Sequence, residues 1–289
     1  MNETPIRKTL AWRCCDRIFE IRERPLLMGV VNVTPDSFSD GGRYVDPDRA
    51  VAHALQLVED GADIVDVGGE STRPGAAPVT GEEEGRRILP VVARLARECG
   101  AAISVDTRKA TVAERALAEG ASIVNDVSAL TQDPRMPEVA REFGAGVILM
   151  HMRGEPRTMQ EDPRYGNVIR EVSDYLAGRV GELVEKGLRL DTLAIDPGVG
   201  FGKTLEHNVQ LLAGLDEMCA GEQPVVVGLS RKSFLGKLTG REVDERLAAS
   251  LAGLAFCVLR GAHVLRVHDV LESWDVGRVL TALTGGAPR

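Results

Sequence analysis

Polar side chains that can bind ligands or catalyse recur along the sequence, each at the end of a short apolar run. Together they supply carboxylates, amides, hydroxyls and cations: Asn32, Asp66, Asp106, Asn125, Asp126, His151, Asp196, Ser230, Lys232, Arg266 and His268. Any one of them has a plain alternative role as a helix N-cap or a satisfied group at a rim. Their recurrence at the same place in successive runs favours one shared site.

The chemistry of these groups indicates a phosphorylated heterocycle as the ligand. Arg266 can bind a phosphate or pyrophosphate with two donors, and Lys232 adds a point charge. An ionised aspartate only accepts hydrogen bonds, so the carboxylates and Asn125 suit the donor edge of a ring. Asn32 offers an oxygen to a hard cation such as Mg²⁺, which keeps waters and bridges substrate phosphates. The set therefore predicts a donor-rich ring joined to a phosphorylated leaving group.

The stretch GVGFGKT, residues 198–204, looks like a phosphate-binding loop but matches neither common pattern. The Walker pattern G-x-x-x-x-G-K-[ST] requires a glycine where this chain has Pro197. The dinucleotide fingerprint G-x-G-x-x-G fails because the third glycine falls one residue early. These residues therefore do not predict a nucleotide site.

The composition excludes several classes of protein. The chain has 289 residues, 44% of them hydrophobic, and a formal net charge of −8, which argues against a nucleic-acid partner. Its longest apolar stretch, residues 247–259, is too short to span a bilayer and predicts a buried helix. The N-terminus lacks the apolar core of a signal peptide. Five cysteines without C-x-x-C spacing indicate reduced thiols, so we expect a cytoplasmic protein without a membrane partner.

Apolar runs of β type alternate with amphipathic helical patterns along the chain. The runs are residues 26–32, 63–67, 102–106, 122–126, 146–151, 193–196, 225–230 and 263–268. Their near-continuous apolar character is typical of parallel strands buried on both faces. Such strands separated by helices predict an α/β fold, a single (β/α)₈ TIM barrel whose site lies at the C-terminal strand ends. A doubly wound open sheet is the less favoured alternative.

The first residues predict a short β-hairpin ahead of the barrel, since AWRCCDRIFEIRER carries two short runs around a turn. We therefore expect an N-terminal extension over residues 1–25 and one catalytic barrel over residues 26–289. No internal repeat, linker or low-complexity tract divides the sequence further.

Several motifs follow one another at the expected strand ends: MGVVNVTPDSFSDGG, DIVDVGGESTRPGA, ISVDT, IVNDVSA, LMHMRGEPRTMQ, IDPGVGFGKT, GLSRKSFLG and LRVHDV. In this combination the chain resembles the dihydropteroate synthase family from about Leu26 to Leu283. The resemblance implies a pterin-binding transferase barrel of folate biosynthesis. It would join 6-hydroxymethyl-7,8-dihydropterin pyrophosphate to p-aminobenzoate, releasing pyrophosphate and forming 7,8-dihydropteroate. Val199 is the main departure, because relatives often carry a bulkier residue there.

The resemblance also implies a role for individual residues. The catalytic groups would be Asp106, Asp196, Lys232, Arg266 and His268. The pterin pyrophosphate would be bound by Thr72, Asp106, Asn125, Asp196, Lys232, Arg266, Val267 and His268. The p-aminobenzoate pocket would comprise Thr72, Arg73, Pro74, Phe201, Ser230 and Lys232. Phe38 and Asp40 would close over the substrates, Asn32 would bind Mg²⁺, and GVGFGKT would be a flexible turn that brings Phe201 to the site.

Three alternatives are compatible with many of the same residues. A methyltetrahydrofolate methyltransferase would share the pterin-binding carboxylates and amide but would not need the pair Arg266 and His268. A Schiff-base aldolase would use Lys232 and leave Asn32 idle. A paralogue kept only for binding would not need the intact set of polar strand ends.

For the synthase reaction, we expect pyrophosphate to depart before the amine attacks. Mg²⁺, Arg266 and His268 would stabilise the charge that gathers on pyrophosphate. Asp106 and Asp196 would stabilise the cationic exocyclic carbon that remains. The neutral amine of p-aminobenzoate is already nucleophilic, so no strong general base is required.

The sequence also predicts assembly. Residues 244–261 form a helical pattern that is apolar or small around nearly its whole circumference. Such a helix must be covered, and no spare segment is available to cover it. We therefore expect a two-fold homodimer that uses this helix and residues 270–283, with Leu254 or Ala255 facing the partner.

Overall fold

The computed structural model describes residues 9–22, 24–34, 46–71, 78–155 and 158–284, and its centre is an eight-stranded parallel barrel. The strands follow the order β8-β7-β6-β5-β4-β3-β10-β9. Their bounds are β3 (Leu26–Asn32), β4 (Ile64–Gly68), β5 (Ala102–Asp106), β6 (Ile123–Asp126), β7 (Gly146–Met150), β8 (Leu193–Asp196), β9 (Val226–Val227) and β10 (Val264–Val267). A single parallel bridge from Ile195 to Val225 joins β8 to the β9 segment and closes the circle. The predicted (β/α)₈ barrel is confirmed.

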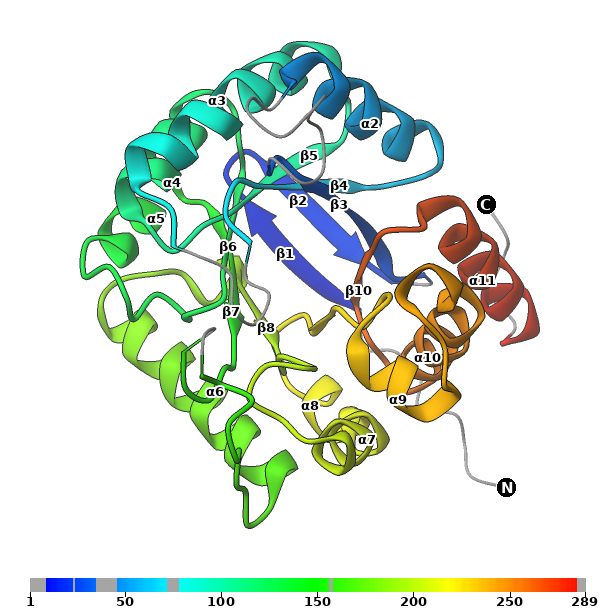
Figure 1. Cartoon of the computed structure of the whole chain (residues 1–289). Coiled ribbons are helices and arrows are strands. Elements are labelled where there is room, and N and C mark those ends of the chain that lie inside the picture. Colours follow the sequence, from blue (N-terminus) through cyan, green and yellow to red (C-terminus); the bar gives the residue numbers. More distant parts are fainter. Residues whose placement is uncertain (1–8, 23, 35–45, 72–77, 156–157, 285–289) are drawn as a thin grey trace.

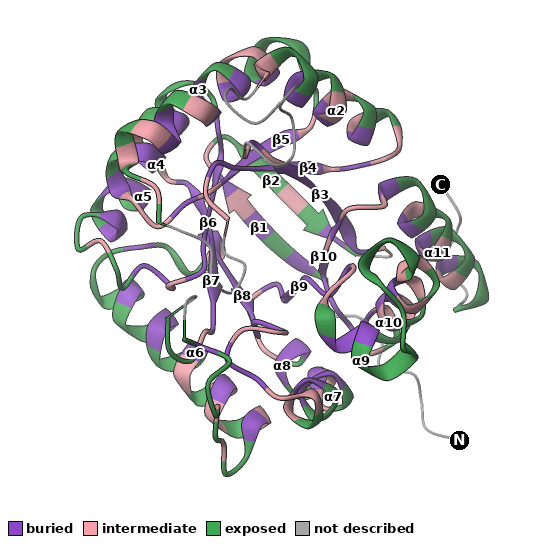
Figure 2. Ribbon diagram, viewed as in Figure 1, coloured by how far each residue is buried: buried purple, intermediate pink, exposed green. Residues whose placement is uncertain are grey.

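The helices form an outer ring around this barrel (Figure 1). They are α2 (Pro47–Glu59), α3 (Gly81–Glu98), α4 (Ala110–Ala118), α5 (Met136–Phe143), α6 (Val168–Glu185), α7 (Leu205–Ala213), α8 (Leu215–Cys219), α9 (Ser233–Thr239), α10 (Leu247–Leu259) and α11 (Val270–Leu283). In Figure 2 their buried positions face the strands and their exposed positions face outwards. None of the helices in the described part of the chain is long and apolar enough to cross a bilayer.

The strand predicted at residues 225–230 is much shorter than expected, whereas the other seven agree within one residue at either end. After β9 the chain turns sharply. The Lys232 amide donates to the carbonyl of Leu229 at 3.1 Å, and Arg231 adopts a φ of 58°. This turn takes Ser230 and Lys232 out of the sheet and places them at the rim of the barrel.

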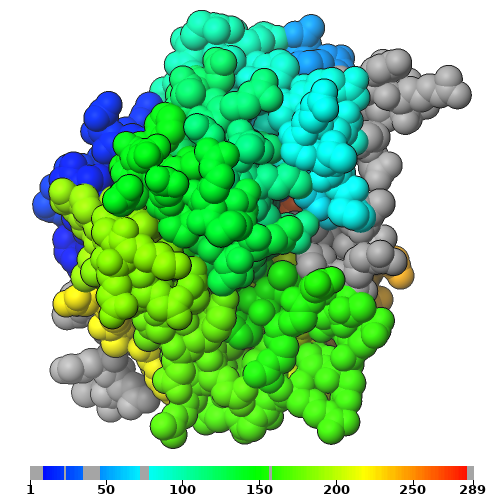
Figure 3. Space-filling model, turned by 90° about the vertical axis from the view of Figure 1, so that its left-hand side faces the viewer, coloured from blue at the N-terminus to red at the C-terminus, as the bar shows by residue number. Residues whose placement is uncertain are grey.

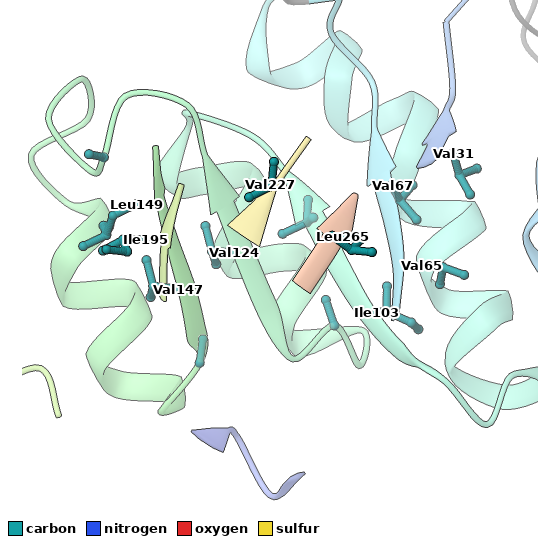
Figure 4. Close-up of a cluster of buried hydrophobic side chains, with 14 of the residues drawn as sticks. Val31, Val65, Val67, Ile103, Val124, Val147, Leu149, Ile195, Val227 and Leu265 are labelled. Carbon is teal, nitrogen blue, oxygen red and sulfur yellow. The ribbon is translucent and has the colours of Figure 1, made fainter. Parts of the chain in front are cut away.

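Alternation along each strand separates two kinds of side chain. One set faces the helices and forms the outer core (Figure 4): Val31, Val65, Val67, Ile103, Val124, Val147, Leu149, Ile195, Val227 and Leu265. The intervening residues face the lumen, because successive side chains of a strand point to opposite sides. Near the N-terminal strand ends these lumen residues are apolar, as Ile64, Ile123 and Val264 are. Two residues closer to the C-terminal end of the same strands, the lumen residues are the polar Asp66, Asn125 and Arg266.

The predicted hairpin is present and closes the N-terminal end of the barrel. Strands β1 (Leu10–Cys14) and β2 (Arg17–Ile21) pair antiparallel and cross the centre of the ring in Figure 1. Trp12, Cys14 and Ile21 are buried among the apolar lumen residues. The Trp12 indole Nε1 donates to the carbonyl of Thr192 at 2.9 Å. In Figure 3 the hairpin, in dark blue, lies at one edge of the helical wall.

Trp12→Ala should lower the free energy of unfolding by about 3–5 kcal/mol, because it empties a large buried volume and leaves the Thr192 carbonyl unpaired. Urea denaturation measures the change. Phe19→Ala is the matched control, since Phe19 is the half-buried ring beside Trp12, with centroids 6.0 Å apart. We expect it to cost less than half as much; an equal loss would show that the hairpin stabilises the barrel without a special contribution from Trp12.

Helix α10 is not the buried helix that its composition predicts. Only Ser250, Leu254 and Cys257 are buried on it, whereas Phe256 and Leu259 are exposed. The helix belongs to the outer ring, so one of its faces packs on the barrel and the opposite face points away from it (Figure 2). Leu254 is 1% exposed and lies in the core, so the prediction that it faces a partner subunit is wrong.

Candidate active site

The C-terminal half of the lumen is organised around Arg266 of β10. Its Nε donates to Asp66 Oδ2 at 2.7 Å, and its Nη2 donates to Asp106 Oδ2 at 3.0 Å. These three residues come from β10, β4 and β5; β4 and β5 are adjacent, and β3 lies between β4 and β10. Their convergence follows from strand alternation, because each lies on the lumen side of its strand. A guanidinium carries five N–H groups, so this arrangement leaves three of them for another acceptor.

Burial raises the pKa of two carboxylates of the lumen, Asp106 and Asp196. Burial raises the pKa of Asp106, and the nearby charge of Asp66 raises it further, while Arg266 opposes both effects. Burial also raises the pKa of Asp196, against the favourable charge of Lys232. Carboxylates held in a weakly polar cavity interact strongly with any positive charge that forms beside them.

Asp66 is a site residue to which the sequence reasoning assigned no role beyond membership of the polar set. It is fully buried, and its Oδ2 also accepts from Asn125 Nδ2 at 3.1 Å. Since a carboxylate cannot donate, Asn125 must turn its NH₂ group towards Asp66. The carbonyl oxygen of Asn125 and its second N–H then remain for a ligand. The alternation of DIVDV, with Asp66 two residues after the lumen residue Ile64, was the signal that could have identified it.

Two buried polar atoms in the same region lack a partner among the described residues, Asp66 Oδ1 and Ser104 Oγ. Asp66 and Ser104 are register partners on β4 and β5, so both side chains face the lumen side by side. Buried polar atoms in folded proteins are almost always hydrogen-bonded. An acceptor and a hydroxyl without partners therefore leave unsatisfied polar groups on the lumen side of β4 and β5.

Lys232 and Phe201 meet where the chain leaves β8 and β9. The ammonium Nζ of Lys232 donates to the carbonyl of Val199 and lies 4.7 Å from the centre of the Phe201 ring. Burial lowers the pKa of Lys232 to about 8, although the charge of Asp196 acts in the opposite direction. Lys232 and Phe201 thus lie together, as the resemblance implied.

Residues 198–202, which the resemblance led us to expect as a flexible turn, form a turn that is hydrogen-bonded to the surrounding structure. The Gly198 amide donates to Asp196 Oδ1 at 2.7 Å, and the Gly200 amide donates to Asn208 Oδ1 at the same distance. Lys203, to which no role was assigned from the sequence, makes further bonds to the turn from inside the protein. The three glycines all have positive φ, which is why the turn requires them.

Ser230 and His268 form a contact at the rim. The Ser230 hydroxyl accepts from the His268 amide at 3.3 Å and lies 3.1 Å from His268 Nδ1. His268 lies two residues after Arg266, so both follow the lumen side of β10. Val267 lies between them and has its side chain in the outer core. If Val267 contacts a substrate as predicted, only its backbone can do so.

Two members of the polar set lie away from the lumen. Asp126 faces outwards and accepts from the amides of Ser128 and Leu130 at 2.7 and 3.2 Å, so it stabilises a loop. His151 is buried beside Lys203, and burial, followed by the charge of Lys203, lowers its pKa to about 3. The structure therefore separates these two from Asp106, Asn125 and Asp196.

Some predicted residues lie outside the described part of the chain: Phe38, Asp40, Thr72, Arg73 and Pro74. Asn32 is described and is half-buried at the end of β3, beside Gly68 of β4. Within the described ranges no group of three or more histidine, cysteine or acidic residues is placed to hold a metal. A single amide oxygen fits Mg²⁺, which takes its remaining ligands from water and substrate phosphates.

Comparison with known proteins gives consistent matches. A family profile described as "Pterin binding enzyme" matches residues 28–268. The dihydropteroate synthase of Escherichia coli K12 is 47% identical over 258 residues, which cover 89% of this chain and 91% of that protein. The structure of Xanthomonas albilineans dihydropteroate synthase with 4-aminobenzoic acid has a TM-score of 0.90 and 45% identity, covering 97% of this chain and 100% of the other. The same organism's enzyme in complex with 7,8-dihydropteroate has a TM-score of 0.86 and 42% identity, covering 96% and 100%.

Proposed function

The chain belongs to the dihydropteroate synthase family of pterin-binding enzymes, and we propose that it catalyses the reaction for which that family is named. In this reaction 6-hydroxymethyl-7,8-dihydropterin pyrophosphate and p-aminobenzoate give 7,8-dihydropteroate and pyrophosphate. The observation that carries the proposal is the set of acceptors in the lumen, Asp106, Asn125 and Asp196, gathered beside Arg266 and Lys232. Similar proteins have been solved with 4-aminobenzoic acid and with 7,8-dihydropteroate.

The pterin ring would lie against the lumen carboxylates. Asp106 and Asp196 present acceptors to its N–H groups, while Asn125 presents one acceptor and one donor because Asp66 fixes its amide. When the carbon–oxygen bond to pyrophosphate breaks, positive charge develops on the exocyclic carbon. Carboxylates in a buried cavity stabilise that charge more strongly than water does.

The leaving group would lie over Arg266 and His268. The N–H groups that Arg266 does not use on Asp66 and Asp106 would bind two pyrophosphate oxygens. His268, fixed by Ser230, would add a further donor. Asn32 would hold Mg²⁺, which neutralises negative charge on the departing pyrophosphate when it is bound.

The p-aminobenzoate would lie beside Phe201, Ser230 and Lys232, with Thr72, Arg73 and Pro74 as further predicted members of its pocket. Its neutral amine forms the new carbon–nitrogen bond and then loses one proton. Pyrophosphate leaves before this attack, so the electrons of the broken bond stay on the leaving oxygen. Phe38 and Asp40 remain the predicted closing residues.

An assay of dihydropteroate formation tests this function, with the pterin pyrophosphate, p-aminobenzoate and Mg²⁺ omitted in turn. We expect product only when all three are present. A stepwise order additionally predicts that crystals soaked with pterin pyrophosphate and Mg²⁺ alone contain a cleaved pterin. Trapping of a carbonyl substrate on Lys232 by borohydride, without dihydropteroate formation, would instead support the aldolase alternative.

A cytoplasmic homodimer completes the proposal. All five cysteines are free, which suits a reducing compartment. Helices α10 and α11 pack against each other, and each exposes large apolar residues, such as Phe256 at 40% and Val279 at 57%. Exposed apolar side chains on two adjacent helices favour burial against a second copy of the same surface.

Phe256→Glu should convert the dimer into a monomer of about 31.1 kDa, measured by light scattering after size exclusion. A glutamate at this position would bring a charge into the two-fold interface, and its desolvation, which the neighbouring Arg260 offsets only in part, opposes association. Phe143→Glu is the matched control, because Phe143 is 36% exposed on α5, away from α10. A wild-type chain that is monomeric at micromolar concentrations would contradict the dimer.

A further inference from the structure

Lys203, the lysine of GVGFGKT, points into the protein and is only 3% exposed. Its Nζ donates to the carbonyl of Gly198 at 2.9 Å and to the carbonyl of Phe201 at 3.1 Å. The third neighbour is His151 Nδ1, at 3.1 Å. Three acceptors match the three N–H groups of an ammonium, so none is left over to bind a phosphate.

His151 is held in place to accept this third bond. Its ring meets Tyr175 edge-on at a centroid distance of 5.0 Å and lies 6.1 Å from the Tyr165 ring. Because burial keeps the imidazole neutral, one of its nitrogens is free to accept a hydrogen bond. The hydroxyl of Tyr165 donates to the carbonyl of Gly202 at 2.9 Å, so the same cluster also contacts the far end of the turn.

The turn that Lys203 holds contacts two residues of the active site, Asp196 and Lys232. The Gly198 amide donates to Asp196, and the Val199 carbonyl accepts from Lys232. The Phe201 ring lies over the Lys232 ammonium. A shift of the turn would therefore move Phe201 and release Lys232, whereas Asp196 would remain on its strand.

The composition of the turn explains why it needs a support of this kind. Gly198, Gly200 and Gly202 lose more conformational freedom on ordering than any other residue type would. A β-carbon on Gly198 or Gly202 would lie 1.9 or 2.3 Å from the backbone oxygens of His151 and Arg153, so glycine is required there. Bonds from Lys203 to the carbonyls of Gly198 and Phe201 fix both ends of this otherwise pliant segment.

We propose that Lys203 is a positioning residue that holds the 198–202 turn, so that Phe201 and the Val199 carbonyl keep the p-aminobenzoate side of the site in place around Lys232. The inference rests on the proposed function, and it assigns to Lys203 no contact with either substrate. This role explains why GVGFGKT contains a lysine although it is not a phosphate-binding loop: the lysine binds backbone carbonyls of the same stretch.

Lys203→Met tests the proposal, since methionine fills similar space without a donor. We expect the KM for p-aminobenzoate to rise about tenfold or more, because small displacements of a positioning group have effects of this size. The KM for the pterin pyrophosphate should change less than threefold. Thr204→Ala is the matched control: it removes the hydrogen bond that the His207 amide donates to Thr204 Oγ1 at the start of α7 and leaves the turn carbonyls bound. The control should leave both KM values within twofold of wild type.

A double-mutant cycle with Phe201→Ala shows whether Lys203 acts through Phe201. In the Phe201→Ala background, Lys203→Met should raise the KM for p-aminobenzoate clearly less than it does in the wild type, because only the route through the Val199 carbonyl and Lys232 remains. A full effect in that background, equal rises in both KM values, or no rise at all would overturn the proposal. If Lys203→Met does not fold, Lys203→Gln, which keeps two N–H donors, should fold and show an intermediate KM. A wild-type chain that makes no dihydropteroate would remove the proposed function, and this inference with it.

Discussion

Asp106→Asn should lower the kcat/KM for dihydropteroate formation by about a hundredfold or more. The substitution preserves the size of the side chain but removes a buried charge that faces the developing cation. It also exchanges one acceptor oxygen for an NH₂ group, which would face both Arg266 Nη2 and the donor edge of the pterin. Two donors facing each other leave both groups unsatisfied. Steady-state kinetics measure the fall in kcat/KM, and denaturant unfolding curves show whether the variant is also less stable than the wild type.

Asp126→Asn is the control for that experiment. Asp126 also ends a strand and is fully buried, but its carboxylate accepts from the Ser128 and Leu130 amides rather than from Arg266. We expect reduced stability, with kcat/KM of the folded protein within threefold of wild type. Similar losses of activity in the two variants, or a normal rate in Asp106→Asn, would remove Asp106 from the pterin site.

Arg266→Lys should weaken pyrophosphate binding at least tenfold and reduce turnover by a comparable or larger factor. An ammonium cannot bridge Asp66 and Asp106 while also presenting two parallel donors to a phosphate. Its failure to reach both carboxylates would leave one of them buried without a cation, so the variant should also unfold at lower denaturant. Isothermal titration with pyrophosphate and Mg²⁺ measures the loss of affinity.

Arg231→Lys provides the matched comparison. Arg231 also donates from two nitrogens, Nε and Nη2, to one carboxylate, that of Asp269, but its side chain is 37% exposed. Exposed ion pairs contribute at most about 1 kcal/mol, so we expect pyrophosphate affinity to stay within threefold of wild type. Unchanged affinity in Arg266→Lys would assign Arg266 a purely structural role.

The strands and their order along the chain were predictable because buried parallel strands have an apolar signature that few other elements share. The same periodicity predicts that Asp106, Asn125, Asp196 and Arg266 lie at one end of the barrel. It failed at residues 225–230, where β-type residues continue beyond the last strand pairing. There the chain leaves the sheet at a turn in which Arg231 has a positive φ. A non-glycine residue seldom adopts this conformation, so the residue type does not predict the turn.

The contacts between side chains could not be read from the sequence. Asp66 was visible as a polar strand end, but its bonds to Asn125 and Arg266 depend on the distance across the lumen. Lys203 was visible as part of a glycine-rich stretch, yet its direction into the protein depends on the buried His151. The outward face of α10 was misjudged because composition cannot distinguish a helix with one covered face from one that is covered all round.

The hairpin that closes the barrel has a consequence for synthesis on the ribosome. It emerges before the strands of the barrel, and an isolated two-stranded hairpin is barely stable in water. The carbonyl that accepts from Trp12 belongs to Thr192, 180 residues later in the chain. Contacts between such distant residues form late, so Trp12 and Ile21 stay exposed to chaperones until most of the barrel has been made. Nascent chains that end before residue 192 should therefore be degraded rapidly, however well their strands have begun to pair.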